Sequence, residues 1–197
     1  DGAASIEKAI PVIIDSKTQY VAACNAAETL LVHKDIADVL LPLLADASGS
    51  KIQYRCDDRA GDLMPSEPAT DEDFSTEYLD YILSVKIVDD IDEAIDHINR
   101  YGSHHTDCII TEDKDSADKF MALVDSAGVY LNCSTRFADG FRYGFGAEVG
   151  ISTGKIHARG PVGLDGLVTY KYKLEGNGQI VADYSSGKSQ FHFRDLI

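Results

Sequence analysis

Basic side chains are scarce in this sequence. Lys and Arg together number 18 against 33 Asp and Glu, so the formal net charge is −15 at pH 7. Such a surface repels the phosphates of nucleic acids and of anionic lipids, which excludes both as expected partners. Long apolar runs are also missing, and the N-terminal stretch has no basic region followed by an apolar core. We therefore expect neither a membrane span nor a signal peptide.

Cysteine is sparse as well. Cys24, Cys56, Cys108 and Cys133 stand singly, without a Cys-x-x-Cys pair or a histidine at metal-ligand spacing. This argues against a zinc site and against a disulfide framework, and it favours a reducing, cytoplasmic location. Any one of them, considered without its flanking residues, is expected to be a small buried apolar side chain, and three of the four are interpreted in this way.

The apolar residues that are present follow a helical period in several segments. The most regular segment is expected to be capped by Asp35, and its apolar face consists of Ile36, Val39, Leu40, Leu43, Leu44 and Ala47. A helix capped by Ser5 is interrupted by Pro11, which predicts a kink or a later start. Two further helices are predicted over residues 91–98, ended by Gly102, and residues 117–124, ended by Gly128.

Strand-like segments alternate with these helices. Strands are predicted over residues 29–33, 51–56, 81–88, 107–111 and 129–132, and the acidic, proline-containing residues 57–76 are predicted to form a long surface loop. Alternation of strands and helices indicates an α/β fold with a largely parallel sheet flanked by helices. Residues 167–174 and 179–184 around Asn177-Gly178 predict a C-terminal β-hairpin.

Several strings in a fixed order carry a specific resemblance. The first is Ala22-Ala-Cys24-Asn-Ala-Ala-Glu28-Thr-Leu-Leu-Val-His33, and others begin at Glu77, Glu93, His105, Asn132, Phe145 and His157. Together they resemble the γ-glutamyl phosphate reductases, a branch of the aldehyde dehydrogenases that also forms the C-terminal part of bifunctional pyrroline-5-carboxylate synthases. The resemblance covers nearly the whole chain, and it implies an aldehyde-dehydrogenase-type catalytic domain.

The resemblance makes Cys24 the expected nucleophile. A thiolate attacks the acyl carbon of an acyl phosphate, phosphate departs, and the thioester that remains can be reduced by hydride. Because a free thiol has a pKa of about 8.5, a useful site must favour its anion. Cys24 is expected at a helix-to-strand turn, where backbone N–H groups could support the thiolate and a developing oxyanion.

Two glutamates near this chemistry have two interpretations each. In the wider superfamily a glutamate activates water for thioester hydrolysis, but the reductive direction needs no water, so Glu28 is interpreted as structural rather than as a general base. Glu77 matches the superfamily glutamate that holds the nicotinamide ribose, and it is the predicted cofactor contact. The alternative for Glu77 is an ordinary acidic residue at the end of a solvated loop.

Cations suited to the anionic groups of the substrate are few. Ser134, Thr135 and Arg136 form a small polar turn and are predicted to bind substrate, since the planar guanidinium matches carboxylate and phosphate geometry. His157 and Arg159 are further substrate candidates. In the alternative interpretation, Arg159 pairs with a structural acid beneath the site.

Two other kinds of site are disfavoured by the sequence. The adjacent His104 and His105 point apart and have no third ligand nearby, so no metal site is predicted. Cys24 with one of the six histidines could form a thiol hydrolase dyad, but no local signature supports it. The glycines of residues 140–150 do not fit the G-x-G-x-x-G pattern of a dinucleotide loop and are interpreted as turn residues.

The resemblance also implies a function and a domain organisation. The expected reaction is NADPH-dependent reduction of L-glutamyl 5-phosphate to L-glutamate 5-semialdehyde with phosphate release, in proline biosynthesis. Alternatives are a catalytically silent assembly or regulatory domain of the same fold, and an aldehyde dehydrogenase of different substrate. Residues 1–164 are the expected catalytic domain and residues 165–197 an oligomerisation hairpin with a tail, which implies a homodimer or higher homo-oligomer. The family's upstream nucleotide-binding domain has no counterpart in this sequence.

Overall fold

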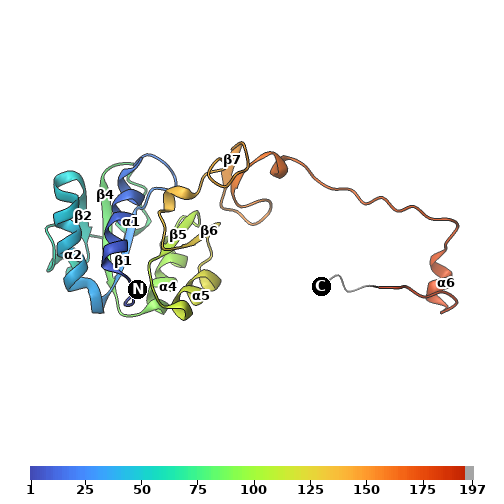
Figure 1. Ribbon diagram of the computed structural model, residues 1–197, viewed down its shortest axis with the longest axis horizontal. Coiled ribbons are helices and arrows are strands. Elements are labelled where there is room, and N and C mark those ends of the chain that lie inside the picture. The colour runs from blue at the N-terminus through green and yellow to red at the C-terminus, as the bar shows by residue number, and fades with distance from the viewer. Residues whose placement is uncertain (194–197) are drawn as a thin grey trace. The chain divides into compact units, whose positions relative to one another are not determined.

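The computed structural model describes residues 1–193 and contains two compact units, divided between Leu167 and Val168 (Figure 1). The first unit holds three groups of strands. Its main sheet has the order β1-β4-β2-β3, from β1 (Thr29–His33), β4 (Ile82–Val88), β2 (Gln53–Cys56) and β3 (Glu67–Pro68), and all of its pairs are parallel. The other two groups are the parallel pair β5 (Thr106–Ile109) and β6 (Gly128–Leu131), and the antiparallel pair β7 (Gly150–Ser152) and β8 (Gly160–Val162).

Helices connect and cover these strands. α4 and α5 pack against each other, and α5 packs against β6 (Figure 1). The α-helices are α1 (Ile6–Thr18), α2 (Lys34–Ser48), α3 (Asp58–Gly61), α4 (Ile91–Tyr101), α5 (Lys114–Leu123) and α6 (Val181–Ser185). The short 3-10 helices are η1 (Gly49–Lys51), η2 (Asp73–Ser75), η3 (Thr135–Phe137) and η4 (Leu164–Leu167). The predicted parallel α/β architecture is therefore confirmed.

The predicted start of α1 is confirmed. The Ser5 side chain accepts a hydrogen bond from the Lys8 backbone N–H and caps the helix. Pro11 lies inside α1 and does not mark its start. α1 therefore runs without interruption from its cap to the turn that carries Cys24.

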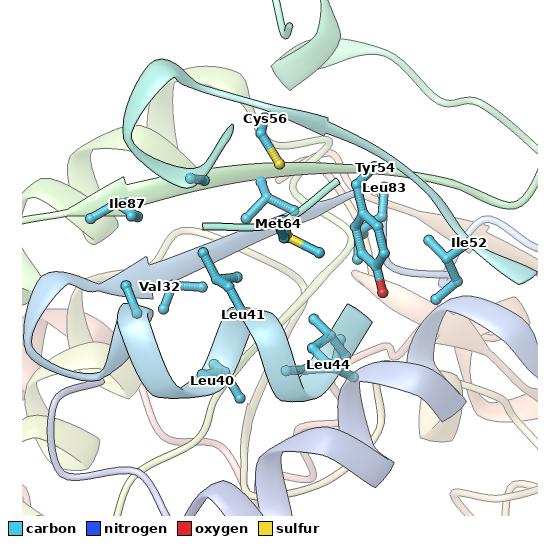
Figure 2. Packing of buried hydrophobic residues seen from close by; sticks show 14 of the residues in the cluster. Val32, Leu40, Leu41, Leu44, Ile52, Tyr54, Cys56, Met64, Leu83 and Ile87 are labelled. Carbon is cyan, nitrogen blue, oxygen red and sulfur yellow. The ribbon is translucent and has the colours of Figure 1, made fainter. Parts of the chain in front are cut away.

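The main core lies between α2 and the four-stranded sheet. Leu41, Leu44, Leu83 and Val85 are fully buried there, and Val32 of β1 is nearly so. Figure 2 shows Leu41 between α2 and the strand that carries Val32. Burying a leucine or valine side chain contributes about 1.5–3 kcal/mol, so this cluster is the principal source of stability in the first unit.

Helix α2 forms as predicted, but its cap and its buried face differ. The N-cap is His33, whose Nδ1 accepts from the Asp35 backbone N–H at 3.2 Å. Val39 and Leu43, predicted to be buried, are 52% and 46% exposed, whereas Ala37 and Leu41 are buried together with Leu40 and Leu44. Because α2 has apolar residues on more than half of its circumference, contact with the sheet decides which of them are buried.

The segment predicted to be a plain surface loop, residues 57–76, is partly ordered. It contains α3, β3 and η2, and Met64 and Asp73 are buried. The Asp73 carboxylate accepts hydrogen bonds from Arg55 at 2.6 Å, from the Thr70 backbone N–H at 2.7 Å and from the Tyr78 hydroxyl at 2.7 Å. These bonds connect the end of the loop, on both sides of Glu77, to strand β2 of the sheet.

The antiparallel pairing lies earlier in the chain than predicted. β7 and β8 form an antiparallel pair, whereas residues 168–180 contain no strand and the predicted returning strand over 179–184 is largely helix α6. A two-stranded ribbon is marginal in water without a surface to cover it. The apolar side chains of residues 168–174 are accordingly exposed in this single chain. The predicted tail beyond residue 193 lies outside the described residues.

Candidate active site

Cys24 lies in the turn between α1 and β1, as the sequence predicts. The Ala27 backbone N–H donates to the Ser16 carbonyl in α1 at 3.0 Å, and the Ala26 N–H donates to the Ala23 carbonyl at 2.9 Å. Cys24 is the only one of the four cysteines that is exposed, whereas Cys56 is buried. The turn thus presents a thiol that a substrate can reach.

A histidine lies next to this thiol. His105 Nε2 is 3.2 Å from Cys24 Sγ, although 81 residues separate the two in the sequence. His105 immediately precedes β5 and is buried, and its Nδ1 lies 2.8 Å from Thr106 Oγ1. The structure therefore brings together the nucleophile and an imidazole that the sequence does not single out as functional.

Burial favours the neutral form of both members of the pair. Burial raises the pKa of the Cys24 thiol, and the carboxylates of Glu148 and Glu77 raise it further, against a lowering by Arg136. Burial lowers the pKa of the His105 imidazole, against a raising effect of the same two carboxylates. The resting site consequently holds a protonated thiol beside a neutral imidazole, and the thiol needs a proton acceptor to become a strong nucleophile.

Ser134 and Thr135 are buried and hold the cysteine turn. Ser16 Oγ donates to Ser134 Oγ at 3.3 Å and accepts from the Thr135 backbone N–H at 3.2 Å. Thr135 Oγ1 donates to the Asn25 carbonyl at 2.7 Å. Both predicted substrate residues thus connect η3 with α1 and with the residue after Cys24.

Arg136 lies at the edge of the same site. Its Nε donates to Gln19 Oε1 at 2.9 Å, and its positive charge lowers the pKa of the Cys24 thiol. Its own pKa is lowered by burial and by the nearby Arg142. Among the predicted substrate residues, Arg136 is the cation that the structure places within electrostatic reach of the nucleophile.

Arg159 and His157 have different surroundings. Arg159 donates to Asp125 Oδ1 at 3.0 Å and to the Thr153 carbonyl at 3.1 Å. This ion pair matches the alternative interpretation, in which Arg159 pairs with a structural acid. His157 is exposed, and its Nδ1 lies 3.3 Å from the Ala158 carbonyl.

Glu28 is engaged in a buried ion pair. Lys17 Nζ donates to Glu28 Oε2 at 2.6 Å, and the Lys17 side chain is fully buried. Burial raises the pKa of Glu28, while bonds from Lys17 and from the Tyr78 and Leu79 backbone oppose that rise. These contacts join α1 and β1 to the segment that follows Glu77, which supports the structural interpretation of Glu28.

A cavity of about 240 Å³ opens beside Cys24. Its wall includes Glu77, which is exposed, together with residues of β1, α4 and β5. Glu77 and Cys24 therefore both line this cavity. Within residues 1–193, no three His, Cys, Asp or Glu side chains are grouped as metal ligands, and no helix is long and apolar enough to cross a bilayer.

His105 is the residue that sequence reasoning missed. The sequence offers it only as half of an adjacent pair with His104, which is rejected as a metal site, and as one of six histidines that could pair with Cys24. Spacing along the chain carries no information about a contact over 81 residues. The one available signal is that His105 opens one of the strings that carry the resemblance.

Comparison with known proteins identifies what this chain is similar to. No family model matches it. It is 62% identical over 192 residues to a γ-glutamyl phosphate reductase of Acetivibrio thermocellus, covering 97% of this chain and 44% of that protein. It is 61% identical to γ-glutamyl phosphate reductase 1 of a Synechocystis species, covering 100% of this chain and 46% of that protein. The chain thus spans less than half the length of these relatives.

Solved structures agree with these similarities. The crystal structure of a γ-glutamyl phosphate reductase from Thermotoga maritima superimposes with a TM-score of 0.88 at 47% identity, over 90% of this chain and 44% of that one. Lactaldehyde dehydrogenase from Escherichia coli aligns with a TM-score of 0.60 at 20% identity, over 84% of this chain and 43% of that one, which shows a shared fold. The resemblance inferred from the ordered strings and the aldehyde-dehydrogenase-type fold are both confirmed.

Proposed function

We propose that this chain is the thiol-bearing part of a γ-glutamyl phosphate reductase, which reduces L-glutamyl 5-phosphate to L-glutamate 5-semialdehyde with NADPH and releases phosphate, in proline biosynthesis. The observation that carries the proposal is Cys24, which lies exposed on a cavity wall within a chain 62% identical to such a reductase. The substrate is small, and the cavity of about 240 Å³ is of a size to hold its acyl end.

The proposed chemistry begins at Cys24. The sulfur lone pair attacks the acyl carbon, the bond from that carbon to the phosphate oxygen breaks, and phosphate leaves with the bonding electrons. The product is a thioester on Cys24. A thioester is a better hydride acceptor than a carboxylate or an oxygen ester, so the cysteine converts a reactive phosphate into a reducible intermediate.

Arg136 is the proposed anion-binding residue at this step. Its guanidinium lies close enough to influence the Cys24 pKa, and its Nε is already held by Gln19. The remaining N–H groups are suited to a carboxylate or phosphate oxygen. The hydroxyl groups of Ser134 and Thr135 are hydrogen-bonded within the chain. Their proposed role is therefore to hold the cysteine turn and Arg136 in position rather than to bind the substrate directly.

The cofactor fits this chain only in part. A nicotinamide cofactor supplies a hydride when bound, and three neighbours of the same fold carry NADP or NAD in their structures. Glu77 is the residue of this chain that could accept hydrogen bonds from a ribose. One or two such bonds contribute about 0.5–1.5 kcal/mol each, whereas a micromolar Kd requires about −8 kcal/mol. We therefore expect this chain alone to bind NADPH more weakly than micromolar, as calorimetry can check.

The nucleophile is tested by substitution in the intact enzyme. Cys24→Ala should abolish phosphate-dependent oxidation of glutamate 5-semialdehyde while the circular dichroism spectrum is unchanged. The matched control is Cys133→Ala, which removes a half-buried thiol that has no proposed role and should keep most of the activity. Iodoacetamide labelling with peptide mapping should find Cys24 first. Preferential labelling of another cysteine, with an active Cys24→Ala enzyme, would favour an assembly domain or a different chemistry.

A further inference from the structure

Among residues 1–193, one ionisable side chain lies within hydrogen-bonding distance of the Cys24 sulfur. It is His105, whose Nε2 is 3.2 Å from Sγ. The two residues come from different elements, the α1–β1 turn and the start of β5. Their contact is consequently a property of the tertiary structure.

The imidazole is held in a defined orientation. The ring is buried, and its Nδ1 lies 2.8 Å from Thr106 Oγ1. The backbone of residues 104 and 105 is hydrogen-bonded to the start of β6. The Ala127 N–H donates to the His104 carbonyl and the Gly128 N–H donates to the His105 carbonyl, both at 2.9 Å. When Nδ1–H donates to Thr106, Nε2 carries a lone pair that faces the thiol.

The charged groups around Cys24 and His105 favour transfer of the thiol proton to the imidazole during the reaction and not before it. Glu77 and Glu148 are the carboxylates that face both groups, and Arg136 is the cation that faces the sulfur. The carboxylates disfavour an early thiolate and stabilise an imidazolium once it forms. Glu28, the other candidate base, is already paired with Lys17 and accepts hydrogen bonds from the backbone N–H groups of Tyr78 and Leu79.

We propose that His105 is the general base of the acylation step and takes the Cys24 proton at Nε2 as Sγ attacks the acyl carbon. The S–H bond breaks, the S–C bond forms, the C–O bond to phosphate breaks, and phosphate leaves with its electron pair. The proton rests on the His105 imidazolium, beside Glu77 and Glu148, and then passes to the departing phosphate or to water. This role rests on the proposed function, because it names the partner of the same nucleophile.

Acylation needs no nicotinamide, so it can be measured on this chain with acetyl phosphate as the acyl donor. The readouts are phosphate release in a single turnover and the mass of the acylated protein. Near pH 7, His105→Gln should slow acylation by about 100-fold, the usual lower range for general-base catalysis. As the pH rises through the pKa of the Cys24 thiol, the thiol ionises without help and the difference should close.

Two further variants separate proton transfer from structure. His105→Ala leaves a space beside the sulfur, and added imidazole should restore part of its rate. His192→Gln, which changes an exposed histidine in the second unit, should react like the unchanged chain. A deficit of His105→Gln that is equal at every pH, or a rate within twofold of the unchanged chain near pH 7, would overturn the role of His105. Acylation that survives Cys24→Ala would instead overturn the proposed function.

Discussion

β1 and the segment 168–174 are both short apolar stretches, and they differ in what lies beside them. In β1 each residue pairs with one of β4, from Thr29 with Ser84 to His33 with Val88, and Val32 is 1% exposed. In the second unit, Tyr172 and Leu174 are 89% and 98% exposed, and residues 168–180 contain no strand. A short apolar segment thus becomes a strand only where the chain supplies a partner for its backbone groups and a surface for its side chains.

The largest expected effect comes from matched leucine truncations in the two regions. Leu41→Ala should lower the free energy of unfolding by about 2–5 kcal/mol, because it leaves a cavity between α2 and the sheet. Leu174→Ala removes the same atoms from a side chain that is 98% exposed, and should change that free energy by less than about 0.5 kcal/mol. Urea denaturation of both variants measures the contrast. Equal losses would mean that residue 174 is buried in solution.

A somewhat smaller loss is expected at the ion pair beneath the cysteine turn. Lys17→Met should cost about 1–3 kcal/mol, because it leaves the half-buried Glu28 carboxylate without its cation. Adding Glu28→Gln should recover part of that loss, since no unpaired charge then remains. The double-mutant cycle, measured by denaturation, gives the coupling energy. Additive losses would show that the two side chains do not interact.

The Asp73 network should make the first unit sensitive to acid. Burial raises the Asp73 pKa, but hydrogen bonds from Thr70, Arg55 and Tyr78 outweigh burial and hold that pKa well below its usual range. Its contribution is therefore complete above the unfolded pKa of about 3.9 and is lost as the pH falls through the folded value. Asp73→Asn should cost about 1–2 kcal/mol at neutral pH, and the two melting curves should converge in acid. A constant difference at all pH values would contradict this account.

The smallest effect on the first unit is expected from a change in the exposed row. Tyr172→Asp should leave the free energy of unfolding of residues 1–167 within about 0.5 kcal/mol. We propose that Val168, Tyr170, Tyr172 and Leu174 are covered by the same segment of another copy, so this variant should shift a dimer toward monomer. Light scattering at several concentrations decides the matter, with Lys171→Asp as a control on the opposite side of the predicted strand. If the unchanged chain is a monomer at every concentration, the proposal is wrong.

How far the sequence predicts this fold depends on where each residue's partners lie. Ser5 and Gly102 act locally on adjacent backbone groups, and the helices that they bound form where predicted. The residues against which a helix packs are distant in the sequence. The sequence therefore does not distinguish Leu41, which is buried, from Leu43, which is exposed. The same limitation explains why Asp73, which collects bonds from three segments, was interpreted as part of a plain loop.

The candidate site divides in the same way. Cys24 was predicted because its flanking string is specific, and its position in a helix-to-strand turn follows from local pattern. Arg159 could be given two roles from sequence, and its bond to Asp125 supports the structural one. His105 could not be chosen from among six histidines, because nothing along the chain reports which of them reaches the thiol.

The sequence by itself determined the α/β class, most helices and strands, the acidic surface and the identity of the exposed thiol, since each depends on neighbouring residues or on a specific string. Only the tertiary structure decided which face of α2 is buried, how Glu28 is neutralised by Lys17, and that His105 lies against Cys24. The physical reason is that burial and proton transfer act over a few ångströms in space. The order of residues along a chain does not state which distant side chains will be brought within that range.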